Sequence, residues 1–208
     1  MKIITFTIIY VHLCSYYLEG QNTVTSSNIF DKNIPKNINY KGKVINAANF
    51  TDKTGEYLVF TTETGVYDSE IKNDEIELSD AYIYAFLFSK KNNQYVKIWQ
   101  VQDFITNCPL DIEAKYVKNT FKITDLDRNG IAEIWLMYRK VCRGDVGPSE
   151  MKIIMYEGSK KYAIRGENKV FLQKNEDFKD EYFGGNYNVD QAFKDGPTIF
   201  LNFAKKID

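Results

Sequence analysis

Short runs of β-branched and aromatic residues, separated by turn-forming residues, fill the chain from about residue 40 onward. Runs of this length, bounded by Gly, Asn and Asp, are typical of antiparallel strands. Asp52-Lys53-Thr54-Gly55 and Asn92-Asn93 have the chemistry of hairpin turns, because Gly and Asn tolerate left-handed backbone conformations. The expected hairpins pair residues 43–50 with 57–62, 81–88 with 95–101, 121–124 with 131–141, and 151–156 with 162–164.

The last residues change from this β-type pattern to a helical one. Ile199, Phe200, Phe203, Ala204 and Ile207 recur at helical spacing, and a proline just before them suits the first turn of a helix. We therefore predict a mainly β (α+β) fold. Antiparallel hairpins form one domain over residues 39–208, with a C-terminal helix at about 197–207 packed on the sheet.

The N-terminus has the pattern of a signal peptide. Met1-Lys2 precedes an apolar run over residues 3–13, which is too short to span a bilayer. We expect a leader over residues 1–20, a flexible segment over 21–38, and export to the periplasm, the outer surface or the medium without a transmembrane span in the mature chain. A cut before Cys14 would instead give a lipoprotein, which is less favoured because large residues precede this cysteine.

The predicted leader would remove the chain's one histidine, His12, and one of its three cysteines. Ser-His-Asp catalysis, Cys-His catalysis and the usual zinc sites then lack an imidazole. Cys108 and Cys142 remain, and in an oxidising compartment they are expected to form a disulfide; two unpaired buried thiols are the alternative. The net charge of -1 offers no basic face, so we do not expect a nucleic acid partner.

One acidic segment has the pattern of a metal-binding loop. Asp125, Asp127 and Asn129 alternate and precede a glycine, while Ile131 can offer a backbone carbonyl and Glu133 can complete the shell. Oxygen ligands in irregular geometry suit Ca²⁺. We therefore predict a structural calcium site formed by Asp125, Asp127, Asn129, Ile131 and Glu133.

The sequence on either side of the loop decides between two kinds of calcium site. An EF-hand needs a carboxylate at its twelfth position, and that position here is Leu136 within an apolar run. The loop instead resembles the Asp-x-Asp-x-Asp-Gly-x-x-Asp hairpin loops of integrin-type propeller blades. The alternative is a metal-free turn whose side chains cap their own backbone.

Two further sets of residues suggest carbohydrate chemistry. Trp99 and Trp135 could stack on sugar rings, although aromatic residues in strands usually fill the core. Asp103, Asp111, Glu113 and Asp145 could supply the carboxylate pair of a glycosidase, which depends on a separation that the sequence does not give.

A wider resemblance covers most of the predicted domain. The segments 104–111, 123–138, 141–146, 151–158 and 161–166 resemble a Bacteroidetes family labelled surface polysaccharide biosynthesis protein. The resemblance implies surface polysaccharide or its assembly proteins as partners, and it specifies no reaction. We therefore expect an exported, noncatalytic β module that assists polysaccharide assembly or binds glycan. A carbohydrate-active enzyme that uses carboxylates is the alternative.

Overall fold

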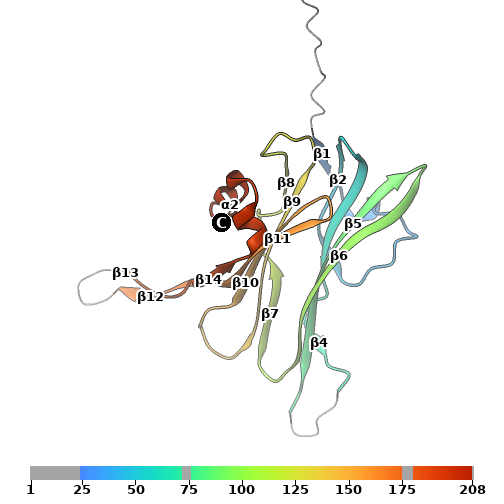
Figure 1. Cartoon of the computed structure of the whole chain (residues 1–208). Coiled ribbons are helices and arrows are strands. Elements are labelled where there is room, and N and C mark those ends of the chain that lie inside the picture. Colours follow the sequence, from blue (N-terminus) through green and yellow to red (C-terminus); the bar gives the residue numbers. More distant parts are fainter. Residues whose placement is uncertain (1–23, 72–75, 175–179, 208) are drawn as a thin grey trace, which may run out of the picture.

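The computed structural model describes residues 24–71, 76–174 and 180–207 (Figure 1). Two six-stranded antiparallel sheets pack face to face and form a β-sandwich, and a separate two-stranded hairpin projects from it. The predicted mainly β fold with antiparallel pairing is therefore confirmed. The predicted signal peptide, with His12 and Cys14, lies outside the described residues.

The first sheet is built from the N-terminal half of the chain. Its strands follow the order β1-β2-β3-β5, with β4 and β6 both paired to β5. Their bounds are β1 (Thr25–Asn28), β2 (Lys43–Asp52), β3 (Gly55–Glu63), β4 (Tyr67–Asp68), β5 (Ser79–Lys91) and β6 (Gln94–Cys108). The turn between β5 and β6 has positive φ at Asn92 (51°) and Asn93 (59°), as the hairpin chemistry of these two residues predicts.

The second sheet follows in sequence and has the order β14-β11-β10-β9-β7, with β8 also paired to β9. Its strands are β7 (Asp111–Tyr116), β8 (Lys122–Thr124), β9 (Glu133–Arg143), β10 (Glu150–Glu157), β11 (Lys160–Glu167) and β14 (Tyr187–Val189). Between β11 and β14 the chain forms the projecting hairpin of β12 (Lys169–Lys174) and β13 (Asp180–Gly184).

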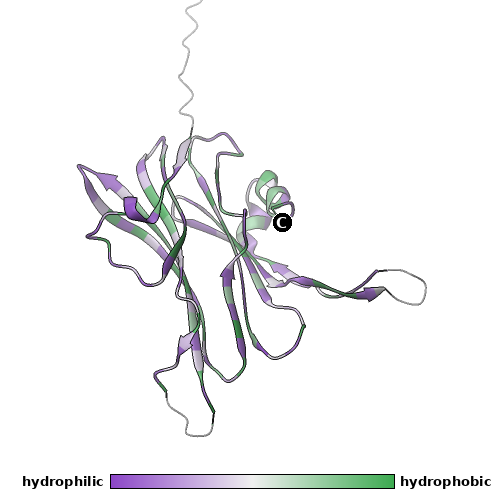
Figure 2. Ribbon diagram, turned by 180° about the vertical axis from the view of Figure 1, so that it is seen from behind, coloured by the Kyte–Doolittle hydropathy of each residue, from purple (hydrophilic) through white to green (hydrophobic). Residues whose placement is uncertain are grey.

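The central strands are apolar on both faces, because one face packs in the core between the sheets and part of the other face is covered by segments outside the sheets. On β5, Ala81, Ile83, Ala85 and Leu87 point into the core between the sheets. The intervening aromatic side chains of β5 belong to a second cluster on the outer face, where the N-terminal segment contributes Ile34. Figure 2 shows hydrophobic residues along the strands of both sheets and on the C-terminal helices. Continuous apolar runs, rather than simple alternation, are what such strands require.

Two short helices, not one, cover the outer face of the second sheet. They are α1 (Gln191–Asp195) and α2 (Thr198–Ala204), separated by Gly196-Pro197. Phe193 of α1 and Phe200 of α2 are buried against Trp135 and Tyr162 of the sheet. The predicted C-terminal helix is thus present as α2, while α1 is too short to show helical periodicity in the sequence.

The segment predicted to be flexible is partly ordered in the structure. Within it, β1 pairs with β2, η1 (Asp31–Asn33) forms a turn of 3₁₀ helix, and Ile34 is buried. Backbone hydrogen bonds to a sheet edge need no side-chain pattern, which explains why a polar Thr-Ser-Ser-Asn sequence forms a strand here.

The predicted disulfide between Cys108 and Cys142 is present, with the two Cα atoms 5.8 Å apart. It joins the end of β6 in the first sheet to β9 in the second, so it is a covalent tie between the sheets. Among the described residues, no helix is long and apolar enough to cross a membrane.

Candidate metal centre

The acidic loop connects β8 to β9 at one end of the sandwich. Its backbone turns sharply at two residues with positive φ, Arg128 (59°) and Gly130 (79°). Glycine adopts this conformation without steric cost, which explains its place in the pattern. The reversal brings the first residues of the loop next to Glu133, the first residue of β9.

Three of the predicted ligands converge. One carboxylate oxygen from each of Asp125, Asp127 and Glu133 lies within 4.8 Å of the other two. Asp125 and Asp127 are half-buried, and Glu133 is fully buried. A single cation placed among these oxygens could therefore contact all three carboxylates.

Hydrogen bonds from the loop backbone hold each of these carboxylates. Leu126 N donates to both oxygens of Glu133 at 2.9 and 3.0 Å, and Gly130 N donates to Asp125 at 3.2 and 3.3 Å. Asn129 N donates to Asp127 Oδ1 at 3.1 Å. The carboxylates are thus oriented by the loop itself, as preorganised ligands require.

The other two predicted ligands lie in the same loop. The Asn129 side chain donates from Nδ2 to Asp127 Oδ2 at 3.0 Å, and its Oδ1 accepts a hydrogen bond from Ile131 N at 2.7 Å. The amide oxygen of Asn129 retains a second lone pair that a metal could use. The Ile131 carbonyl belongs to the same backbone turn, before β9 begins.

The electrostatics of the loop favour a bound cation. Burial raises the pKa of Glu133, the nearby Asp127 and Asp125 raise it further, and hydrogen bonds from Thr124 and Leu126 act in the opposite direction. Among the described residues, no lysine or arginine forms an ion pair with these three carboxylates. A divalent cation would offset this repulsion.

A second layer of contacts supports Glu133. Thr124 Oγ1 donates to Glu133 Oε2 at 2.6 Å, and Trp135 Nε1 donates to the same Thr124 oxygen at 2.8 Å. The side chain of Trp135 is fully buried and packs against Phe203 of α2. The position of Glu133 is therefore set by the packing of the second sheet.

The loop also contacts the first sheet through the β2–β3 turn. Lys53 N donates to Gly130 O at 2.9 Å, and Lys53 Nζ donates to Asn129 O at 2.6 Å. Asp52 Oδ2 accepts a hydrogen bond from Ala132 N at 3.1 Å. These partners are about eighty residues apart in sequence, and the loop pattern alone does not reveal them. The loop therefore joins the two sheets as well as offering oxygen ligands.

The donor set fits a hard cation. All of its ligand atoms are oxygens, and the loop contains neither histidine nor cysteine, the ligands that zinc and softer metals prefer. Three carboxylates with an amide and a backbone carbonyl suit the irregular, oxygen-rich coordination of Ca²⁺ better than the strict octahedron of Mg²⁺.

Of the two tryptophans proposed as sugar platforms, Trp135 is ruled out by its burial. Trp135 is fully buried, so it cannot contact a glycan in the folded protein. Trp99 is half-buried, with its ring stacked on Tyr156 at 4.3 Å and its Nε1 donating to Gly158 O. Trp135 therefore has a packing role on a strand that is buried on both faces, while Trp99 packs on Tyr156 from the more exposed strand β6.

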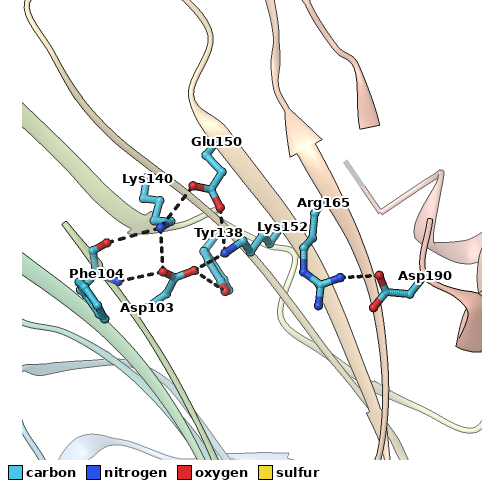
Figure 3. Close-up of polar contacts among 8 residues, drawn as sticks. All are labelled: Asp103, Phe104, Tyr138, Lys140, Glu150, Lys152, Arg165 and Asp190. Carbon is cyan, nitrogen blue, oxygen red and sulfur yellow. Dashed lines mark hydrogen bonds and ion pairs between the residues drawn. The ribbon is translucent and has the colours of Figure 1, made fainter. Parts of the chain in front are cut away.

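The candidate catalytic carboxylates either pair with basic side chains inside the structure or lie exposed at the surface. Asp103 pairs with Lys140 and Lys152 at 2.9 and 2.7 Å in a network between the sheets (Figure 3), while Glu113 pairs with Arg139 at 3.0 Å. Asp145 and Asp111 are exposed, and Asp145 lies 3.8 Å from Arg143. Hydrogen bonds from Lys152 and Lys140 outweigh the effect of burial and lower the pKa of Asp103, which suits ion pairing more than general acid catalysis.

Comparisons of the chain with protein-family models, with curated proteins and with solved structures found no match.

Proposed function

We propose that this chain is an exported, noncatalytic β-sandwich module that binds Ca²⁺ in its acidic loop and serves surface polysaccharide assembly or glycan binding. One observation carries the metal part of the proposal, namely the convergence of Asp125, Asp127 and Glu133 within 4.8 Å. The bound ion has a structural role. It screens three carboxylates from one another and fixes a loop that contacts both sheets.

Two other features support the wider proposal. A disulfide between the sheets is typical of proteins outside the cytosol, where oxidising conditions preserve it. The pairing of Asp103 and Glu113 with basic residues supports a noncatalytic module. The proposed link to polysaccharide rests on the family resemblance of the sequence.

The test is a calcium titration of the purified protein followed by thermal unfolding. At free Ca²⁺ equal to a hundred times the dissociation constant, binding to the native state contributes about 2.7 kcal/mol. For a domain of this size, that contribution raises the unfolding midpoint by roughly 5–10 °C. Asp127→Ala removes one carboxylate and should abolish the rise, and Mg²⁺ should raise the midpoint less than Ca²⁺ does.

Asp145→Ala is the matched control. It deletes the same chemical group from an exposed position outside the loop, with the side chain 79% accessible. In this control variant, Ca²⁺ should raise the unfolding midpoint as much as it does in the wild type. If millimolar calcium leaves the midpoint of the wild-type protein unchanged, or if Asp127→Ala responds like Asp145→Ala, the metal part of the proposal is wrong.

A further inference from the structure

The outer face of the first sheet is only partly covered by the described N-terminal segment. Tyr40 packs edge-on against Phe60 at 5.1 Å, and Ile34 is buried in the same cluster with Phe86 and Phe88. Toward the other end of β5, a groove of about 660 Å³ opens over Tyr82 and Tyr84. This volume is typical of a small-molecule binding site.

A row of aromatic rings lines this groove. Tyr82, Tyr84 and Phe86 lie on one face of β5, because alternate residues of a strand share a face. Their ring centroids are 6.0 and 5.9 Å apart, and the rings are within 16° of parallel. Tyr67 of β4 extends the row at 6.4 Å from Tyr82, and 42% of its surface is exposed. The row therefore ends on an accessible tyrosine.

Amide side chains flank the aromatic row. Gln102 and Gln100 of β6 lie beside Tyr84 and Phe86 in the register of the sheet, and both are exposed. They also line the groove. Gln102 can both donate and accept hydrogen bonds, and Gln100, whose Oε1 accepts a hydrogen bond from Lys97 Nζ at 3.0 Å, offers its amide N–H groups, so donors and acceptors stand next to the aromatic rings.

One end of the groove is held rigidly by hydrogen bonds. Ser69 Oγ donates to Asn107 Oδ1 at 2.8 Å, and Asn107 N donates to Asp80 Oδ1 at 2.9 Å. Asn107 itself has a positive φ of 54°, a conformation that asparagine tolerates. These contacts preorganise the groove wall, which lowers the entropic cost of binding.

The charges around the groove favour a neutral ligand. Its charged lining residues are Lys41, Glu70 and Asp80. Asp80 is buried and accepts the Asn107 hydrogen bond, so the exposed charged groups of the lining are Lys41 and Glu70, which have opposite signs. A nucleic acid or a phosphorylated ligand would need clustered Lys and Arg side chains.

We propose that this groove binds a neutral oligosaccharide. Sugar rings have apolar faces of C–H groups that can lie against aromatic side chains, and hydroxyl groups that can pair with amides. The groove combines the two kinds of partner, Tyr67 and Tyr82 for the faces and Gln100 and Gln102 for the hydroxyls. This inference rests on the glycan-binding part of the proposed function, and it does not depend on calcium. Tyr84 pairs with Thr62 near the end of β3, whereas the metal loop contacts the turn before Gly55.

The experiment is isothermal titration calorimetry of the full chain with five probes, namely maltohexaose, cellohexaose, xylohexaose, mannohexaose and chitohexaose. Each is titrated both with calcium and with chelator. We expect at least one probe to bind, and Tyr67→Ala and Gln102→Ala each to weaken that binding by tenfold or more. Both substituted positions are exposed, so the variants should fold, and thermal unfolding of each variant checks this.

Tyr182→Ala is the matched control, because Tyr182 of the projecting hairpin is 46% exposed and Tyr67 is 42% exposed. The control should bind the probe as the wild type does. Absence of binding by all five probes, or equal binding by the groove variants and the control, would overturn the groove proposal. The calcium titration reports separately on the metal loop, so the two proposals can fail independently.

Discussion

Asp103 provides the sharpest test of how the two sheets are held together. From β6 of the first sheet, its carboxylate contacts Lys140 and Lys152 of the second sheet and accepts a hydrogen bond from Tyr138 Oη at 3.0 Å (Figure 3). The three charged side chains are between 13% and 18% exposed. Asp103→Asn keeps the size and shape of the side chain and removes its charge.

Asp103→Asn is expected to lower the free energy of unfolding, because Lys140 and Lys152 lose a negatively charged partner. Removing one partner of a fully buried ion pair costs about 3–5 kcal/mol. Glu150 lowers this cost, because it contacts Lys140 at 3.3 Å and Lys152 at 2.8 Å and would remain in the variant. The lysines also keep some contact with water. We therefore expect Asp103→Asn to lower the free energy of unfolding by about 2 kcal/mol at pH 7.

The same network predicts how the stability lost in Asp103→Asn depends on pH. Burial acts to raise the pKa of Asp103, but hydrogen bonds from Lys152 and Lys140 outweigh it, so the pKa is lowered from 3.8. A carboxylate whose folded pKa is depressed contributes stability above its unfolded pKa and loses it as the pH falls through the folded value. The difference between the wild type and Asp103→Asn should therefore narrow below pH 3.8.

The assay is urea unfolding monitored by tryptophan fluorescence at several pH values. Asp145→Asn is the control, because it removes an exposed carboxylate and should change the free energy of unfolding by less than about 0.5 kcal/mol. The reasoning is refuted if Asp103→Asn lowers the free energy of unfolding no more than the control does. It is also refuted if the difference in free energy of unfolding between the wild type and Asp103→Asn grows as the pH falls.

Two further predictions concern the disulfide and the half-buried Glu63. Reduction of Cys108–Cys142, which closes a loop of sequence separation 34, should lower stability by about 4 kcal/mol, measured by denaturation with and without reductant; an unchanged midpoint would contradict it. Burial raises the pKa of Glu63 from 4.5, against hydrogen bonding by Tyr116 N and the charge of Lys115. Its folded pKa lies above its unfolded one, so its contribution to stability is greatest below pH 4.5 and is lost as the pH rises through the folded pKa. Glu63→Gln should remove this part of the dependence of the free energy of unfolding on pH, which cannot exceed about 1.4 kcal/mol per pH unit. If the wild type and Glu63→Gln show the same dependence on pH, the raised pKa of Glu63 is contradicted.

The sequence predicts those parts of the fold that depend on local chemistry. The Asn92-Asn93 turn and the turn at Asp52–Gly55 were both identifiable, because specific residues favour these backbone conformations. Strands that lack a strong apolar pattern were not predicted. The β12–β13 hairpin leaves Phe171 and Phe183 more than half exposed, so its residues follow no core-facing period.

In the candidate site, too, the sequence predicts what depends on local spacing and misses what depends on how the sheets pack. The loop pattern predicted the residues that now converge, because their spacing within nine residues fixes which side chains share the inside of the turn. It did not predict the contacts of Asp52 and Lys53, which depend on how the sheets pack. Nor could it place Trp135 in the core. When both faces of a strand are buried, the sequence loses the alternation that separates core positions from surface positions.

The positions of the covalent and polar contacts between the two sheets indicate that calcium, if bound in the loop as proposed, has a local role. The Cys108–Cys142 disulfide and the Asp103 network join the sheets toward one end of β9, where Lys140 and Cys142 lie. The acidic loop and the β2–β3 turn meet at the other end of β9, beside Glu133. A cross-link and an ion-pair network already hold the first end, so the proposed metal would act only at the second. Calcium should therefore order this end of the sandwich, while the fold as a whole and the tyrosine-lined groove near the far end of β3 persist without it.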